Sequence, residues 1–305
     1  MTPPDGVLVV DKAAGMTSHD IVAAVRRRLP RGTKVGHTGT LDPFATGVLP
    51  IVVGKATRLS QFLMSSRKRY RATVAFGTAT DSGDATGEVV ATADARAVAA
   101  LDGDRIGSAL PAFRGTHAQI PPAHSAKKVD GERAYELARR GETVTLAAAD
   151  VTAHVVTLAA WDGAGRTADI ELETSAGYYV RSFARDLGQH LGVPAHLTAL
   201  RRTASGEFTL DDAHGLDTVL GGGRVQDALV PMSALLLHLP AVGVGEPEVQ
   251  DIRQGRPVRP PEAPQATGTG EGQGRVRLLS GGALVALARP MPGQPGLLHA
   301  DIVLI

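Results

Sequence analysis

The sequence of 305 residues contains no cysteine. This absence excludes disulfide scaffolds, cysteine-based zinc sites, thiol nucleophiles and iron–sulfur clusters. It also agrees with a reducing compartment, because disulfide-rich frameworks belong to oxidising ones. No set of His, Asp and Glu residues has the spacing of a metal site, so we expect no bound metal.

Long apolar runs are also missing, because no stretch approaches the ~18 residues that a membrane span needs. The opening segment MTPPDGVLVVDK lacks the basic and apolar regions of a signal peptide, and we interpret it as the beginning of a folded domain. These absences predict a cytoplasmic protein without a membrane partner. Aromatic residues make up only 4% of the chain, so each one beside a polar cluster is unusually informative.

The residues that are present form an ordinary globular mixture, with 43% hydrophobic and 21% charged side chains. The length predicts one large domain and a smaller one. The net charge is only +1, yet basic residues gather at 26–34, 67–71 and 127–140. Such clusters in a neutral protein favour a folded polyanion as partner, although solvated helix faces and turns explain them equally well.

Apolar patterning predicts an alternation of strands and helices. A helix is expected from Thr17 or Ser18 to Pro30, and another over residues 180–191, because each has an apolar stripe at helical spacing. The turn-rich segment 78–87 predicts a loop, and the polar, basic segment 114–142 predicts an excursion from the core. Strands are expected at residues 6–11, 48–53, 70–76, 143–160 and 166–175.

The composition changes towards the C-terminus. Residues 240–275 are rich in Pro and Gly, and 262–275 have the composition of a mobile surface loop. Short strand patterns resume after this loop. We therefore predict a large domain over 1–238 and a small β-rich domain over 239–305.

The most informative segment is GHTGTLDPFATGVLP at residues 36–50. Its three glycines let the backbone approach a ligand closely. Pro43 restricts the backbone of Asp42, so the Asp42 carboxylate is held in a set direction. Taken alone, Asp42 is more often a turn residue, and His37 more often a structural hydrogen-bonding group. The segment lacks the lysine of a P-loop, which disfavours a phosphate-binding hydrolase.

This segment closely resembles the catalytic motif of the bacterial tRNA pseudouridine(55) synthases, the TruB family. Further segments resemble the same family, in the family's order, and together span about residues 6–210. They are Val9–Ser18, Lys68–Ala72, Gln119–Pro122, Ser125–Lys128, Gly177–Ser182, Asp186–Gly188 and Leu200–Arg202. The chain departs from the family pattern at Ala13, His124, Lys127, Thr174 and Ala176. None of these departures falls on an expected catalytic position.

The resemblance implies an α+β fold with a mixed, antiparallel-rich sheet of the pseudouridine synthase type. It also implies a small C-terminal, β-barrel-like domain of the PUA type that binds RNA. The implied activity is isomerisation of uridine 55 in the T-loop of tRNA after base flipping, without a cofactor. The T-arm of tRNA is then the partner, and we expect a monomer without an obligate protein partner.

The same resemblance assigns roles to individual residues. Asp42 is the catalytic carboxylate, Arg181 pairs with it and keeps it ionised, and Tyr70 stacks on the base and handles its proton. His37 assists extrusion of the nucleotide. The other expected substrate-binding residues are Tyr179, Leu200, Lys12 and Lys128. Without the resemblance, the sequence predicts a surface residue at Arg181 and a core residue at Tyr70.

Two other functions fit the sequence. A tRNA-binding folding chaperone without essential catalysis would have the same fold, but Asp42, Tyr70 and Arg181 together argue against a purely binding role. A synthase that modifies ribosomal RNA with guide RNAs would keep the chemistry and change the substrate. The chain has no long lysine-rich tail, which favours the stand-alone tRNA enzyme.

Overall fold

A computed structural model describes residues 4–125, 127–129, 131–134, 137, 140, 142, 146–221, 224–261 and 274–305. The loop expected at 262–275 therefore lies outside the described residues, except for its last two. Among the described helices, none combines the length and the apolar character that crossing a membrane requires.

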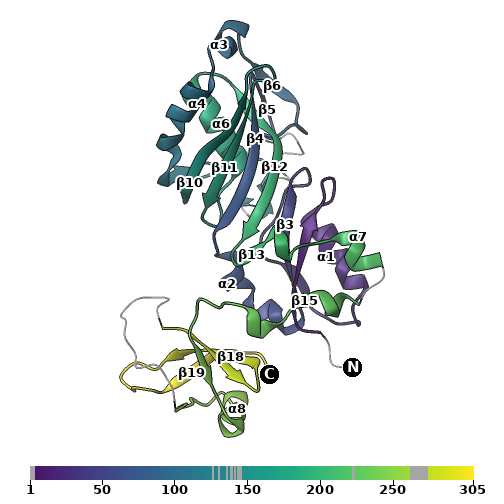
Figure 1. Ribbon diagram of the computed structural model, residues 1–305, viewed down its shortest axis with the longest axis vertical. Helices are drawn as coiled ribbons and strands as arrows, with labels where there is room; N and C mark the ends of the chain where they lie inside the picture. Colours follow the sequence, from purple (N-terminus) through teal and green to yellow (C-terminus); the bar gives the residue numbers. More distant parts are fainter. Residues whose placement is uncertain are drawn as a thin grey trace.

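An 11-stranded sheet forms the frame of the molecule (Figure 1). Its main path runs in the order β14-β1-β3-β12-β4-β11-β10-β7, while β13, β15 and β2 pair with β12, β1 and β3. The strands are β1 (Gly6–Lys12), β2 (Val35–His37), β3 (Thr46–Val53), β4 (Lys68–Phe76), β7 (Gly115–Gln119), β10 (Ala149–Asp162), β11 (Thr167–Thr174), β12 (Ala195–Ser205), β13 (Phe208–Thr209), β14 (His214–Gly215) and β15 (Leu229–Val230). Among the strand pairs of this sheet in the described residues, β1–β14 and β3–β12 are parallel and the others antiparallel, so the predicted antiparallel-rich mixed sheet is confirmed.

Two parts of this sheet meet over a very short pairing. On one side β1 and β3 run antiparallel over their whole length, and on the other β4 lies between β11 and β12 in long antiparallel registers. The two parts are joined where Arg201 and Arg202 of β12 pair with Thr46 and Gly47 of β3. The loop that precedes β3, which contains Asp42, is therefore brought to the middle of the sheet.

Helices cover the sheet where the sequence has an apolar stripe. α1 (Ser18–Arg27) begins with a capping box between Thr17 and Asp20, as the cap prediction required. α6 (Val180–Leu191) ends at Gly192, whose positive φ of 73° suits glycine. Figure 1 shows α4 and α6 beside the part of the sheet that contains β10 and β11, with α1 beside β3.

The remaining helices are short. The α-helices are α2 (Ser60–Met64), α3 (Ala95–Ala99), α4 (Gly103–Ala109), α7 (Leu216–Gly221) and α8 (Glu246–Arg253). The 3₁₀ helices are η1 (Gly54–Leu59), η2 (Leu110–Phe113), η3 (Leu210–Asp212), η4 (Val225–Ala228) and η5 (Met232–Ala234).

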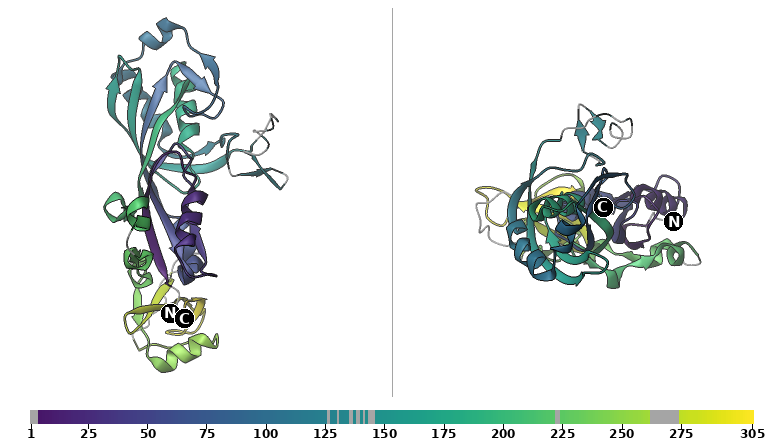
Figure 2. Two further views of the ribbon diagram at one scale, coloured as in Figure 1. Left: turned by 90° about the vertical axis from the view of Figure 1, so that its right-hand side faces the viewer. Right: turned by 90° about the horizontal axis from the view of Figure 1, so that it is seen from above.

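Two irregular segments contain more strand than the sequence suggested. The expected loop 78–87 begins with β5 (Thr78–Thr80), which pairs with β6 (Val89–Thr92) in a hairpin. The expected excursion 114–142 begins with β7, an edge strand paired with β10. The sequence did not predict β7, because an edge strand exposes much of its surface to water and can therefore be polar. Beyond it, β8 (Lys128–Val129) and β9 (Glu132–Arg133) pair in a segment that extends away from the body (Figure 2).

A separate four-stranded sheet forms the C-terminal part, in the order β16 (Ala241–Gly243), β17 (Val276–Ser280), β18 (Ala283–Pro290) and β19 (Leu298–Val303). Within the described residues this sheet is open, so the expected barrel-like closure is corrected; four short strands are too few to close into a barrel. Leu284 and Leu287 of β18 share a buried cluster with Leu59 of η1 and Leu63 near the end of α2. The small sheet is thus docked on the segment 54–64.

Candidate active site

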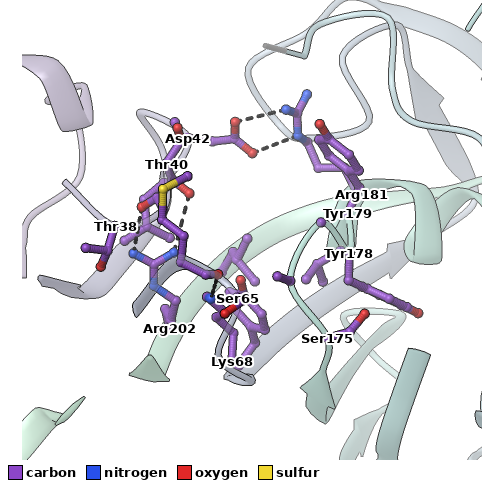
Figure 3. Close-up of a pocket in the computed structure, with 18 of the residues that line it drawn as sticks. Thr38, Thr40, Asp42, Ser65, Lys68, Ser175, Tyr178, Tyr179, Arg181 and Arg202 are labelled. Carbon is purple, nitrogen blue, oxygen red and sulfur yellow. Dashed lines mark hydrogen bonds and ion pairs between the residues drawn. The ribbon is translucent and has the colours of Figure 1, made fainter. Parts of the chain in front are cut away.

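A cavity of about 650 Å³ lies where the two parts of the large sheet meet, a size typical of ligand sites. Its walls come from the loop before β3, the end of α2, strands β4 and β12, and the turn that leads into α6 (Figure 3). Among the residues that line it are Asp42, Tyr70, Tyr179, Arg181 and Leu200. The structure therefore brings together five residues that the sequence analysis singled out from four separate segments.

Asp42 and Arg181 form a bidentate ion pair in the cavity wall. Arg181 Nε donates to Asp42 Oδ2 at 2.8 Å, and Arg181 Nη2 donates to Asp42 Oδ1 at 2.9 Å. Figure 3 shows the carboxylate and the guanidinium pointing toward each other. The Asp42 side chain is 32% exposed and that of Arg181 only 5%, so the carboxylate stays accessible while its partner is buried.

The rest of the Arg181 guanidinium is held by groups that the sequence analysis did not identify. Nη1 donates to the carbonyl of Ser82, and Nη2 donates to the carbonyl of His124, each at 2.9 Å. A buried carboxylate, that of Asp84, lies 3.8 Å from Arg181 Nε. Asp84 and Ser82 belong to the segment expected to be a loop, whose polar composition predicted turns but not this contact. Arg181 is therefore fixed in one direction before any ligand binds.

Opposing effects set the proton affinity of Asp42. Burial raises the pKa of the Asp42 carboxyl above its usual value, and the charge of Asp84 adds to the rise. Arg181 acts against both, through its charge and its hydrogen bonds, and Lys12 helps. Because burial raises the pKa, the ionised form of Asp42 depends on Arg181 remaining in place.

Several contacts hold the Asp42 loop against the beginning of α1. Ser18 Oγ accepts from the amide of Leu41 at 2.8 Å and donates to the Leu41 carbonyl at 3.1 Å. Lys12 is completely buried, and its Nζ donates to the Pro43 carbonyl at 3.1 Å. The same ammonium donates to the carbonyls of Ala13 and Met16. Lys12 thereby connects the Asp42 loop to the turn after β1.

The other side of the loop is held by β12. Arg202 is 1% exposed, and its guanidinium donates to the carbonyls of Val48, Gly39 and Thr40 at 2.7, 3.1 and 3.4 Å. Gly47 has φ of 103°, and a Cβ there would lie 2.2 Å from the Arg202 carbonyl oxygen. The motif requires glycine here, since no other residue fits this approach of β3 to β12.

Tyr179 is positioned by the last residue of β7, Gln119. The amide of Tyr179 donates to Gln119 Oε1 at 2.8 Å, and Gln119 Nε2 donates to the Tyr179 carbonyl at 3.1 Å. One turn on, Ser182 Oγ donates to the Ile120 carbonyl at 2.7 Å. These contacts link two segments that are distant in the sequence. Residues 119–122 hold the turn 177–182, which contains Tyr179 and Arg181, in place.

Two of the expected substrate-binding residues, His37 and Lys12, do not line the cavity. His37 Nδ1 accepts from the amide of Gly39 at 3.3 Å, and burial, with nearby Arg202 and His19, lowers the pKa of the ring. Lys128 lies in β8, and its side chain is outside the described residues. Lys12 is the buried residue described above.

A buried lysine that the sequence analysis did not select lines the cavity. Lys68 is 5% exposed, and its Nζ donates to the carbonyls of Met64 and Ser66. Burial lowers the pKa of Lys68 to about 8. Its place in a cluster of four basic residues at 67–71 gave no signal that distinguished it from its exposed neighbours. Among the described residues, no group of three or more His, Asp or Glu is placed to hold a metal.

Comparison with known proteins agrees with this arrangement. A family model for the N-terminal domain of TruB family pseudouridylate synthases matches residues 26–180, and one for the C-terminal domain of tRNA pseudouridylate synthase B matches residues 181–236. These matches define the class as pseudouridylate synthases. The boundary between them falls inside the Gly177–Ser182 segment. More particularly, the chain belongs to the TruB family.

Individual relatives cover most of the chain. A tRNA pseudouridine synthase B from Solibacter usitatus is 47% identical over 83% of this chain and 85% of its own. One from Thiobacillus denitrificans is 44% identical over 95% of this chain and 93% of its own.

Solved structures share the fold at lower identity. A chain of an H/ACA ribonucleoprotein bound to a substrate RNA containing 2′-deoxyuridine has a TM-score of 0.71 at 24% identity, over 98% of this chain and 85% of its own. A chain of a Cbf5–Nop10–Gar1 complex has a TM-score of 0.70 at 25% identity, with the same coverage. The pseudouridine synthase type of fold expected from the sequence is thereby confirmed.

Proposed function

We propose that this chain isomerises uridine 55 in the T-loop of tRNA to pseudouridine, with Asp42 as the catalytic carboxylate. One observation carries the proposal: an accessible carboxylate, held by a buried guanidinium, lines a cavity together with Tyr70. The membership of the TruB family and the names of its closely similar members support the substrate.

The reaction needs only what this cavity holds. The bond between C1′ and N1 of the uridine breaks, the base turns, and a new bond forms between C1′ and C5. The C5 proton leaves, and N1 gains one, so no electrons leave the substrate. An ionised carboxylate either adds to the sugar or base, or removes a proton as the glycosidic bond breaks. Both routes require Asp42 to be charged, and that is the task of Arg181.

The aromatic residues of the cavity serve the base. Tyr70 offers a flat face for stacking and a hydroxyl for handling the C5 proton, while Tyr179 and Leu200 line the remaining walls. Extruding a stacked base costs a few kcal/mol, and stacking in a pocket returns about 1–3 kcal/mol per base. His37, next to the cavity loop, occupies the gap that the nucleotide leaves in the RNA.

We assign the two lysines different roles. Lys12 is a positioning residue, because its ammonium is buried and already bonded to three carbonyls. Lys128 is a candidate RNA contact in the segment that extends from the body. The division into a catalytic domain over 1–238 and a PUA-type RNA-binding domain over 239–305 belongs to the same proposal. So do binding of the T-arm, a monomeric state without an obligate protein partner, and a cytoplasmic location.

The test is tritium release from C5-labelled uridine in an unmodified tRNA transcript. Wild type is expected to release tritium, Asp42→Asn to release none while it still binds the transcript, and a transcript with cytidine at position 55 to be inert. Asp150→Asn, an exposed position on β10, is the matched control and should behave as wild type. Binding by wild type without release would reject the enzymatic proposal. Full activity of Asp42→Asn would reject the assignment of Asp42.

A further inference from the structure

A second cavity, of about 620 Å³, lies at the far end of α1 from the Asp42 loop. The first residue of α1, Ser18, is bonded to Leu41, next to Asp42. From there α1 extends for 10 residues, about 15 Å, away from the cavity that Asp42 lines. The second cavity is formed by the last turn of α1 and the residues up to Val35, so it is distinct from the proposed active site.

Four cations and no carboxylate line this second cavity: Arg26, Arg27, Arg31 and Lys34. None of the four forms an ion pair within the part of the chain that the structure describes. Arg26 Nη2 donates to the carbonyl of Val35 at 3.1 Å and so has a structural role. Arg27, Arg31 and Lys34 are exposed.

The ordinary explanation covers only part of this cluster. Cations in the last turn of a helix interact favourably with its dipole, which accounts for Arg26 and Arg27. Arg31 and Lys34 lie beyond Pro30, where the helix has ended, and gain nothing from the dipole. Like charges around one hollow repel each other unless an anion lies among them. The arrangement is therefore that of an anion site, open to solvent.

We infer that Arg27, Arg31 and Lys34 bind phosphates of the RNA backbone, at a distance from the nucleotide that is modified. The inference rests on the proposed function, because RNA is the polyanion that the chain must hold. Strand β2 connects the second cavity, called the basic hollow below, directly to His37, beside the active-site loop. RNA bound at the hollow is thus held on the same rigid element that leads to the site of base extrusion. The site strengthens binding and takes no part in the chemistry.

The experiment measures binding and chemistry separately. The triple variant Arg27→Gln/Arg31→Gln/Lys34→Gln leaves Arg26, with its structural bond, intact. Kd for an unmodified tRNA transcript is measured at several salt concentrations, and the single-turnover rate is measured at saturating transcript. We expect Kd to rise at least about tenfold near 0.1 M salt, and the slope of log K against log salt to become shallower by about 2 to 3. The single-turnover rate should stay within about twofold of wild type.

Arg96→Gln is the matched control, since Arg96 is an exposed helical arginine of α3, at the far end of the large sheet (Figure 1). Thermal unfolding of each variant verifies that the fold is retained. An unchanged Kd and salt slope would overturn the inference, and so would a loss of the saturated rate. If wild type binds the transcript but does not turn it over, the proposed function fails, while the salt slopes still decide whether the hollow binds RNA.

Discussion

Replacing Arg181 by methionine tests how the site keeps its carboxylate charged. The variant removes two hydrogen bonds to Asp42 and leaves the carbonyls of Ser82 and His124 without their donor. The buried Asp84 then has no cation at 3.8 Å. Burial, which already raises the pKa of Asp42, is no longer opposed by its strongest counteracting charge.

The size of the effect follows from the geometry. A neighbouring guanidinium lowers a carboxyl pKa by about 1–3 units, so its loss should raise the pKa of Asp42 by a similar amount. Breaking a buried pair costs about 3–5 kcal/mol of stability, and we expect the lower end because the Asp42 side chain is 32% exposed. The raised pKa means that the folded state holds the Asp42 proton more tightly than the unfolded state. The variant should therefore lose stability as pH rises above about 4 and regain it at lower pH.

The assay is the pH profile of kcat/KM for Arg181→Met and Arg181→Lys. The acidic limb should move about 1–3 units higher in the methionine variant and less in the lysine variant, which keeps a charge but cannot form the bidentate pair. Arg256→Met, at an exposed arginine of the C-terminal part that pairs with Asp251, is the control and should leave the profile unchanged. Equal loss of activity at every pH, with the limb unmoved, would refute the reasoning.

Three further outcomes are expected. Gly47→Ala should lower the free energy of unfolding by at least about 3 kcal/mol in urea titrations, because the positive φ and the clash with Arg202 combine. The control Gly255→Ala, at a position with positive φ and open space around it, should lower it by about 1 kcal/mol. Lys68 holds its proton more weakly in the folded state, where its pKa is about 8. The free energy of unfolding of wild type relative to Lys68→Met should therefore rise by about 2 kcal/mol from pH 7 to 9.5. A difference that is flat or falls with pH would contradict this. Lys12→Met should lower kcat with little change in Kd for the transcript, as a positioning role requires; a weaker Kd at unchanged kcat would favour direct contact with substrate.

The elements of the fold were largely predictable because they depend on neighbours in the chain. The apolar stripe of α6 and the cap of α1 are local patterns, and the structure has both helices where they were expected. The loop before β3 was also predictable, from its glycines and Asp42. Within the described residues the C-terminal sheet does not close as expected, since closure depends on how many strands meet and not on the pattern of any one of them.

The partner of Asp42 could not be derived from local pattern. Arg181 lies 139 residues away, and the family resemblance, not its surroundings in the sequence, selected it. Nothing local pointed to Asp84 or Lys68 either, because a carboxylate in a turn and a lysine in a basic cluster are ordinary until their burial is known.

The sequence by itself determined which side chains are available, which segments form helices and strands, and where glycine lets two strands approach. The tertiary structure decided which of those side chains meet. The reason is physical: helix and strand patterns reflect hydrogen bonds and burial within a few residues, whereas the active-site cavity depends on a two-residue pairing between β3 and β12. That pairing sets the distance from Asp42 to Arg181, and it follows from the packing of the whole sheet.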